Sequence, residues 1–416
     1  FNNTAPEFRQ AVEAWCQMAP NARFLITAPG RLGVHSEVVY RLSNLDIEEA
    51  DAPALDLLLT RASAAGADPA SLDPTVARAL VRELDGVPLA LEVTAGLLST
   101  VPGIEILGLL REMPEDFPLR VIGLAWSRAS PSHQSVLAAG AMFPGGFGGW
   151  DIEAVTGMAT DDVEDAISAC LRHYLMVPLD DTGMDDVHRY RLPERIRTLV
   201  LGTLDEAAIQ ERMLRFAEVM LALCEPWQGR VYSREAPETI ARMALETRNL
   251  MEVVKFGLTE RRSSPEALNL GLRALLCLQT VLLRMGPFDL LVRLLDRALS
   301  RCDAVLGTDP VLQVRVLHAR GEAHRERGEM RKAAADYRRG RAIAERWTDL
   351  EGVGMCLTGR GLLEYAEGAH GPAERLLDQA VQLFRTIGQE RWRGLAIGSL
   401  GVICLSVGRF DEAEGR

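Results

Sequence analysis

The sequence predicts a mainly α-helical protein that ends in an α-solenoid. Apolar residues recur at helical spacing over most of the chain after Asp46, and small residues recur every 40 positions near its end. Strand candidates are few and short. At roughly 150 residues per domain, 416 residues allow about two to four domains. The content of 48% apolar and 25% charged residues is that of a chain with a substantial core.

The first 45 residues read as a helix followed by two strands. A helix is expected over Ala5–Met18, with Phe8 and Val12 on its apolar face. The apolar runs Arg23–Thr27 and Val38–Leu42 are typical of short buried parallel strands. From Asp46 onward the pattern turns helical, and helices are expected over Ile47–Ala65, Asp73–Leu84 and Pro88–Leu98.

A composition shift at residues 114–118 separates these helices from a segment with a different pattern of elements. Several short helices are expected within residues 120–200, with a Gly-rich loop at 144–149. Two strand candidates follow, Leu175–Leu179 and His188–Leu192, on either side of an acidic turn. Three helices and a hairpin in this order form the winged-helix plan. Long amphipathic helices are expected over 204–300.

The last hundred residues contain a repeat. Small residues recur in three columns of one register, and large residues such as Tyr337 stand between them. Small residues recur where antiparallel helices cross closely, and the second glycine of each unit falls in the turn between the helices. The pattern resembles the tetratricopeptide repeat with a longer period, and Gly286 starts a weaker unit before it. The columns are Gly321, Gly361 and Gly401; Gly328, Gly368 and Gly408; and Ala333, Ala373 and Ala413.

The charge balance argues against broad docking on nucleic acid. The net charge is −12, and residues 120–200 hold seven Arg against eleven acidic residues, whereas phosphate contacts require a basic face. Residues 315–346 form the one basic stretch, with ten basic and five acidic residues. This stretch is either a solvated face or a docking surface for an acidic partner.

Neither cysteine nor histidine spacing indicates a metal site. The seven Cys are widely spaced without a CxxC pair, which favours reduced core thiols in a cytoplasmic protein. There is no HExxH or GxSxG motif, and no export signal is visible. The sequence has no uninterrupted apolar run of the ~18–20 residues that a membrane span needs. A cytoplasmic location is therefore expected.

Several weak motifs stand in a meaningful order. Gly86-Val-Pro-Leu89 opens an apolar helix and is preceded by residues 24–34. Leu124-Ala-Trp-Ser127, Phe143-Pro-Gly-Gly-Phe147, Tyr190–Arg197 and Leu245–Leu250 follow it. In this order the whole chain resembles the bacterial STAND regulators, which are signal-transduction NTPases with an NB-ARC-like module, a winged helix and tetratricopeptide repeats.

The resemblance implies five modules. They are the end of a P-loop α/β nucleotide-binding domain (1–45), a helical lid (46–117), a winged helix (118–203), a helical linker with the first hairpins (204–300) and tetratricopeptide-like repeats (301–416).

In that family a Walker A lysine and a Walker B aspartate hold ATP or ADP with Mg²⁺. Neither motif is present, and Lys255 and Lys332 are the only lysines, both far from any Gly-rich strand-to-helix turn. Phe1 falls just after the expected Walker B strand. The chain is therefore expected to be a piece of a longer protein, with no catalytic residues and no ATP turnover of its own.

The resemblance also implies nucleotide-facing residues. Pro88 matches a proline that packs on adenine, in a turn shaped by Gly86, Val87 and Leu89. The family's Thr-Ser-Arg strand end corresponds to Thr27, Ala28 and Pro29, so a proline stands at the γ-phosphate sensor position and Arg31 is its possible substitute. Glu194 stands where plant relatives carry an Asp that closes the winged helix over ADP. The alternatives are an ordinary helix start at Pro88 and an exposed ion pair at Glu194.

The function that the resemblance implies is a nucleotide switch. ADP would hold the lid and winged helix closed, and a protein or small-molecule inducer on the concave repeat surface would favour the open state. Exchange for ATP would then permit self-assembly. The alternative is a non-catalytic interaction scaffold with a degenerate nucleotide module, which Pro29 favours. No contact with nucleic acid or membrane is expected from this chain.

Overall fold

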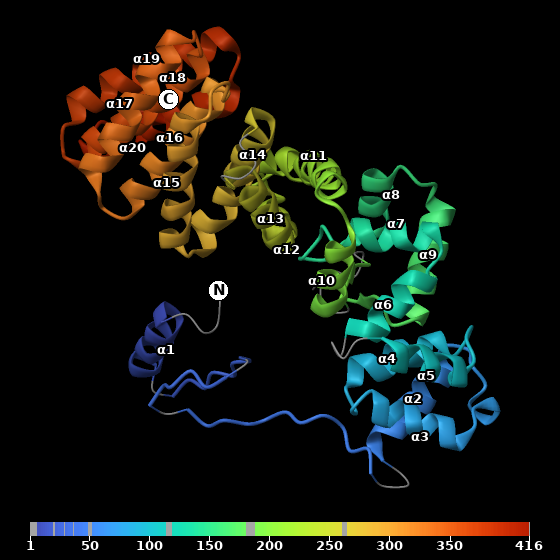
Figure 1. Cartoon of the computed structure of the whole chain (residues 1–416). Coiled ribbons are helices and arrows are strands. Elements are labelled where there is room, and N and C mark those ends of the chain that lie inside the picture. The colour runs from blue at the N-terminus through green and yellow to red at the C-terminus, as the bar shows by residue number, and fades with distance from the viewer. Residues whose placement is uncertain are drawn as a thin grey trace.

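The computed structural model describes residues 6–19, 21–28, 30–35, 37–48, 52–113, 119–179, 188–259 and 264–415. Within these ranges almost all regular structure is helical, and a single two-stranded sheet is present (Figure 1). The predicted mainly α-helical class is confirmed, and the chain ends in the expected α-solenoid.

The N-terminal 48 residues differ from the prediction in one respect. Helix α1 (Pro6–Met18) forms as expected, but the described residues of 21–48 form neither helix nor strand, so the strands expected over 23–27 and 38–42 are absent there. A strand is stabilised by the hydrogen-bond ladder of a neighbouring strand, and the described residues of 21–48 form no such ladder. The apolar side chains that suggested burial face solvent instead, with Leu25 fully exposed and Leu42 85% exposed.

Residues 52–113 form a compact helical unit, named here the lid unit. Proline occupies the first position of α2, α3 and α4, where its fixed φ suits the helix and its missing N–H is not needed. Asp73 caps α3 by accepting the N–H of Thr75 at 2.7 Å. The elements are α2 (Pro53–Ala64), the 3₁₀ helix η1 (Pro69–Ser71), α3 (Pro74–Glu83), α4 (Pro88–Leu97) and α5 (Gly103–Glu112).

Residues 119–203 form a second unit, named here the hairpin unit. Its strands pair antiparallel with Val177 opposite Arg191, inside the two predicted strand ranges, and Phe147 adds an isolated bridge to Tyr190. The acidic turn expected between the strands lies outside the described residues. The elements are α6 (Leu119–Arg128), α7 (Pro131–Gly140), α8 (Gly149–Thr156), α9 (Thr160–Arg172), β1 (Val177–Pro178), β2 (Tyr190–Arg191) and α10 (Glu194–Thr203).

Three connector helices lead from the hairpin unit to a helical array (Figure 1). In the array the first helices of successive hairpins begin at Pro310, Leu350 and Glu390, which reproduces the 40-residue period of the sequence. The connectors are α11 (Glu206–Arg230), α12 (Ala236–Leu245) and α13 (Thr247–Leu258). The array is α14 (Pro265–Met285), α15 (Phe288–Ala304), α16 (Pro310–Glu326), α17 (Met330–Arg346), α18 (Leu350–Ala366), α19 (His370–Ile387), α20 (Glu390–Ser406) and α21 (Phe410–Gly415).

One hydrophobic core runs through most of the molecule. It extends from Ala54 in the lid unit to Ala323 in α16, and a second core beginning at Val314 fills the last hairpins. Within the described residues, α14 is long and apolar enough to cross a membrane by length and composition. It packs as a core helix of the array, where Leu272, Leu275 and Leu278 are fully buried.

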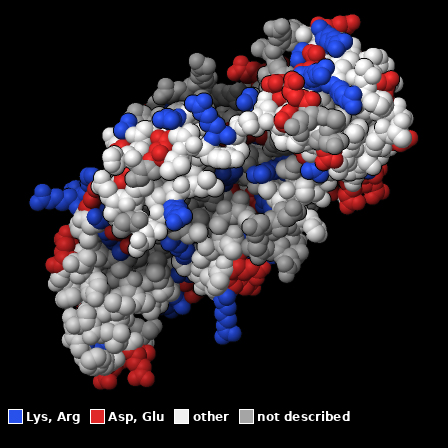
Figure 2. Space-filling model, turned by 90° about the horizontal axis from the view of Figure 1, so that it is seen from below, with Lys and Arg blue, Asp and Glu red and all other residues white. Residues whose placement is uncertain are grey.

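Charged side chains of both signs are interspersed on the face shown in Figure 2. The basic stretch 315–346 follows the same rule, because many of its arginines are paired with acids. Arg315 contacts Asp349 at 3.0 Å, and Arg320 bridges Asp296 and Asp336 at 2.8 and 2.6 Å. This stretch therefore carries less net positive charge at its surface than its composition indicates.

Candidate functional site

The Pro88 turn is the first predicted nucleotide-facing element. Pro88 is the first residue of α4 and is exposed, whereas Val87 and Leu89 are half-buried against the lid core. Gly86 is buried with φ of +62°, and a Cβ there would lie 2.2 Å from the carbonyl oxygen of Leu45. The backbone at Leu45 donates to the Gly86 carbonyl at 3.0 Å. The turn thus needs a glycine at its base and presents Pro88 to solvent.

Thr27 and Arg31 lie in the extended N-terminal segment rather than beside Pro88. Both are exposed, and Pro29 between them lies outside the described residues. Arg31 lies near Glu37, whose carboxylate accepts the N–H groups of Gly33 and Leu32 at 2.8 and 3.0 Å. These backbone bonds, the one from Gly33 first and with a smaller contribution from Arg31, lower the pKa of Glu37. The γ-phosphate role of Arg31 stays a prediction.

Glu194 belongs to the hairpin unit, where it opens α10. Its side chain is 76% exposed, and its carboxylate lies 3.5 Å from Arg197 one turn later. An exposed pair of this kind contributes little to stability. The structure thus places Glu194 in the alternative arrangement that the sequence also suggested, at an ion pair on its own helix.

The lid unit and the hairpin unit meet at a contact that we name the Arg120 joint. Arg120 on α6 donates to the carbonyl oxygens of Leu110 at 3.0 Å and Glu83 at 3.2 Å, near the ends of α5 and α3. It also lies 3.2 Å from the Glu83 carboxylate. A cation at the C-terminal end of a helix satisfies its unpaired carbonyls and complements its dipole. One arginine therefore holds two lid helices against the hairpin unit.

A close backbone approach completes the Arg120 joint. A Cβ at Gly96 in α4 would lie 2.6 Å from the Cα of His173, so only glycine fits there. The adjoining Tyr174, with φ of +55°, donates its hydroxyl to the Arg61 carbonyl at 3.1 Å, and the Arg61 guanidinium lies 5.5 Å from the tyrosine ring centre. The Arg120 and Glu83 side chains of this joint are partly buried, whereas the Tyr174 hydroxyl and Arg61 are more exposed.

The hairpin unit meets the connector helices at the Arg189 joint. Arg189, next to β2, forms a two-pronged ion pair with Glu246 and donates to the Gly146 carbonyl at 2.6 Å. Asn249 on α13 donates to the same carbonyl at 2.9 Å and to Glu246 at 2.7 Å, and accepts the Gly145 N–H at 2.8 Å. All three side chains are buried, with at most 7% exposed. The network fixes the Gly-rich loop to the start of α13.

Burial perturbs the ionisable groups of the Arg189 joint. Burial raises the pKa of Asp151 to about 6; the Gly148 N–H lowers it, and the neighbouring Glu246 charge raises it further. Asp151 caps α8 by accepting that N–H at 2.7 Å. Burial alone would lower the pKa of Arg189, but its hydrogen bonds to Glu246 raise it, so this guanidinium stays charged. The joint therefore contains a carboxyl group that titrates near pH 6.

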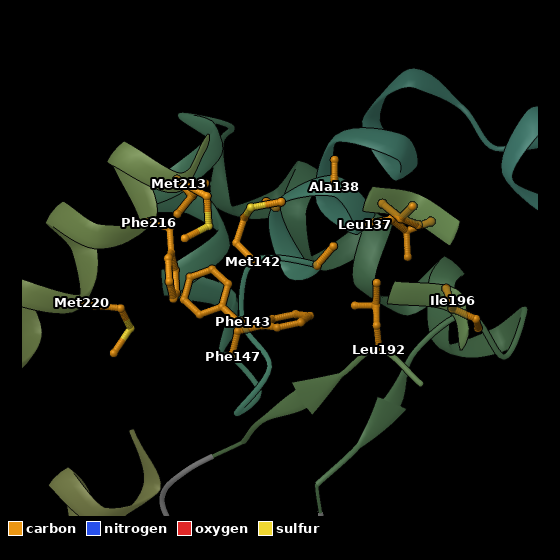
Figure 3. Close-up of a cluster of buried hydrophobic side chains, with 14 of the residues drawn as sticks. Leu137, Ala138, Met142, Phe143, Phe147, Leu192, Ile196, Met213, Phe216 and Met220 are labelled. Atoms are coloured by element: carbon orange, nitrogen blue, oxygen red, sulfur yellow. The ribbon is translucent and has the colours of Figure 1, made fainter. Parts of the chain in front are cut away.

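An apolar cluster of the hairpin unit and α11 includes the two phenylalanines on either side of the Gly-rich loop (Figure 3). The Phe143 ring packs edge-on against Phe216 of α11, with ring centres 4.6 Å apart, and Phe147 lies 5.8 Å from Phe143. Met142 and Met220 line the same cluster, and all five side chains are at most 1% exposed. Phe143 and Phe147 flank the Gly-rich loop, so apolar and polar contacts hold the same loop.

The predicted repeat residues line the helix crossings of the array. A Cβ at Gly321 would lie 2.5 Å from the Tyr337 ring, and one at Gly361 would lie 2.8 Å from Leu377. Ala333 and Ala373 are fully buried, whereas Gly401 and Ala413 pack more loosely. The turn glycines Gly328, Gly368 and Gly408 have φ between +76° and +79°, the left-handed conformation that ends a helix.

Sequence reasoning missed the two joint arginines. Arg120 and Arg189 look like ordinary surface arginines in the sequence, because burial of an arginine depends on acids and carbonyls that arrive from elsewhere in the chain. Glu246 and Asn249 carried a weak signal, since they lie one turn apart within the Leu245–Leu250 motif at the start of a helix. Among the described residues no group of three His, Cys, Asp or Glu could hold a metal ion.

No protein-family model matches the chain, and no curated protein matches it. Among solved structures the chain is similar to the crystal structure of a signal transduction ATPase with numerous domains (STAND) with a tetratricopeptide repeat sensor from Pyrococcus horikoshii. The identity is 14%, the TM-score is 0.43, and the match covers 91% of this chain. The chain spans 53% of the length of that protein.

Proposed function

We propose that this chain is the coupling and sensing part of a STAND-type nucleotide-switched regulator. In this proposal the lid unit and the hairpin unit, acting as a winged helix, close over ADP, and the array receives a protein or small-molecule inducer. Opening permits exchange for ATP with Mg²⁺ and self-assembly. The order of the motifs along the sequence, from Gly86–Leu89 to Leu245–Leu250, supports the proposal.

The observation that carries the proposal is mechanical continuity. A switch requires that a ligand at one site favour one arrangement of another site, so the intervening elements must move as discrete bodies. One hydrophobic core runs from the lid unit into α16, and two arginine-centred joints divide it. Movement of the array would thus reach the hairpin unit and then the lid.

The chain's own residues supply the nucleotide-facing surface of the proposal. Pro88 is exposed at the first turn of α4, whose leading N–H groups lack a side-chain cap. A flat apolar side chain at this position suits the face of an adenine ring. Thr27, Arg31 and Glu194 would contribute only if the extended N-terminal segment and α10 approached the Pro88 turn. ATP hydrolysis is not part of the proposal for this chain, which has neither Walker motif.

The test is the affinity of the parent protein, containing this chain, for ADP. Pro88→Ala should raise the Kd for ADP about tenfold, through loss of roughly 1.4 kcal/mol of contact. Pro131→Ala is the matched control, because Pro131 occupies the same first helical position of α7 in the hairpin unit. Equal affinity of the wild type and Pro88→Ala would remove the adenine contact.

A non-catalytic scaffold is the second candidate, and the sensor-position proline at residue 29 favours it. Only the array would then have a binding role. Absence of ADP binding to the parent protein, together with a ligand bound by the array, would establish this candidate instead.

A further inference from the structure

Three residues from distant parts of the chain meet beside the array. Tyr232 lies in the turn between α11 and α12, Arg284 lies near the end of α14, and Arg391 lies in the first turn of α20. The guanidinium carbons of Arg391 and Arg284 lie 4.4 and 5.3 Å from the centre of the Tyr232 ring. Arg391 also lies 5.2 Å from the Trp392 ring. The connector turn therefore contacts the fourth hairpin of the array, α20 and α21, through a cation–π contact.

These two arginines are electrically uncompensated in a chain of net charge −12. Within the described part of the chain, Arg284 donates to the Thr280 carbonyl at 2.9 Å, and neither guanidinium has a carboxylate partner. The nearby Glu390 is instead paired with Arg393 at 2.9 Å. Other exposed arginines of the array, such as Arg331 and Arg346, also lack an ion pair in the described structure, but Arg284 and Arg391 are the pair that share one aromatic ring.

The cation–π contacts leave N–H donors of both guanidiniums available, although Arg284 uses one NH2 group on the Thr280 carbonyl. A guanidinium over an aromatic ring uses its face, whereas its five N–H donors lie in its plane. Arg284 and Arg391 are both exposed, and Tyr232 is 64% exposed, so solvent reaches these edges. Two forks near one ring match the oxygens of a phosphate or carboxylate group.

We propose that Tyr232, Arg284 and Arg391 form an oxyanion-binding site that accepts a phosphate or carboxylate group of a small anionic ligand. The ligand class rests on the N–H donors that Arg284 and Arg391 hold beside one tyrosine ring without a carboxylate partner. The assignment as an inducer site rests on the sensing role proposed above for the array, but binding itself does not.

The site adjoins the packing of three hairpin helices. Trp392, next to Arg391, stacks on Phe384 of α19 and lies edge-on to His318 of α16, with ring centres 6.1 and 5.7 Å apart. His318 lies 5.6 Å from the ring of Tyr337, which fills the space left by Gly321. An anion that fixes Arg391 against Tyr232 would therefore hold α20 to the connector turn. Through Trp392 and His318 it would also change the packing of α20 against α16 and α17.

The test is a titration of the 416-residue chain with inorganic phosphate and, separately, with citrate, at constant ionic strength. Calorimetry gives Kd, and tryptophan fluorescence reports on Trp392, with Trp392→Phe as its reference. Arg284→Gln and Arg391→Gln should each raise Kd about tenfold, as expected for loss of a charge-assisted contact. Tyr232→Leu, which keeps both charges, should weaken binding by a smaller factor.

Arg331→Gln and Arg346→Gln are the matched controls, because both residues are exposed arginines of α17. They should leave Kd unchanged. Saturable binding of either anion that depends on Arg284 and Arg391 supports the site, and the preferred probe identifies phosphate or carboxylate. No saturable binding, or equal weakening by the controls, would overturn it. Binding to the site without any change in the ADP affinity of the parent protein would contradict the switch and leave the site standing.

Discussion

The Arg120 joint and the Arg189 joint both connect two units through an arginine, but they differ in burial and in the groups that the arginine contacts. Both place one arginine across the boundary between two packed units. Arg189 is 7% exposed and pairs with Glu246, which is 5% exposed, whereas Arg120 and its partner Glu83 retain 13% and 23% exposure. The Arg189 joint also fixes a glycine loop from two sides, and the Arg120 joint caps two helix ends. This difference predicts that separating the lid unit from the hairpin unit requires less free energy than separating the hairpin unit from the connectors.

Removal of the buried cation should have the largest effect. Arg189→Met leaves Glu246 buried without its partner, which should lower the free energy of unfolding around α12 and α13 by about 3–5 kcal/mol. Arg120→Met should cost only about 1–2 kcal/mol, because water reaches the groups it leaves unpaired. Hydrogen exchange of residues 236–258 and 74–112 measures the two effects separately.

The exposed Arg191, two residues after Arg189, gives the control for the first variant. Arg191→Met should change neither region. The double variant Arg189→Met/Glu246→Met should recover part of the loss, because it buries no unpaired charge. A double variant as unstable as the sum of its parts would show that the pair is not coupled.

The pH dependence of the Arg189 joint should follow Asp151. Its folded pKa is about 6, above the ordinary value of 3.8, so the folded state binds the proton more tightly than the unfolded state. The contribution of Asp151 to the free energy of unfolding should therefore be greatest below pH 4. It should fall by up to about 3 kcal/mol as the pH rises through 6.

Asp151→Asn tests this effect, because an amide oxygen still accepts the Gly148 N–H without ionising. Denaturant unfolding at pH 5 and pH 8 should show a smaller loss for this variant than for the wild type. Asp161→Asn, at an exposed position in the first turn of α9, is the matched control and should keep the wild-type loss. An unchanged loss in Asp151→Asn would assign the pH dependence to another group.

The close approach at Gly96 should respond to a single methyl group. Gly96→Ala places a Cβ 2.6 Å from the His173 backbone and should cost about 1–3 kcal/mol at the Arg120 joint, through displacement of α4. Gly108→Ala in α5 meets nothing within 4 Å and should be neutral or slightly stabilising, since alanine favours helix. Thermal unfolding of the two variants provides the comparison.

The sequence predicted the helices better than the contacts between them. Proline and small-residue patterns located α3 and α4 to within about two residues, and the 40-residue period anticipated the array, because these signals are local. The predicted strands over 23–27 and 38–42 are wrong, since a strand depends on a neighbouring strand that the described residues of 6–48 do not supply. The joints could not be predicted. Arg189 and Glu246 are 57 residues apart, and the sequence around each of them does not identify the residue it pairs with.

Of the nucleotide-facing candidates, the exposure of Pro88 and the glycine requirement at Gly86 follow from the turn that the motif encodes. Their roles toward adenine, and those of Thr27, Arg31 and Glu194, stay predictions. A ligand contact depends on an interface that a motif identifies only by analogy.

Distances between spin labels test the contrast between the joints most directly. Labels at the exposed positions Arg82 in α3, Glu164 in α9 and Glu218 in α11, in a chain with Cys16→Ser, report the lid unit, the hairpin unit and the connectors. The 164–218 distance distribution should be narrow and should broaden in Arg189→Met, whereas the 82–164 distribution should already be broader in the wild type. A 164–218 distribution as broad as the 82–164 one, or unaffected by Arg189→Met, would contradict the rigid Arg189 joint.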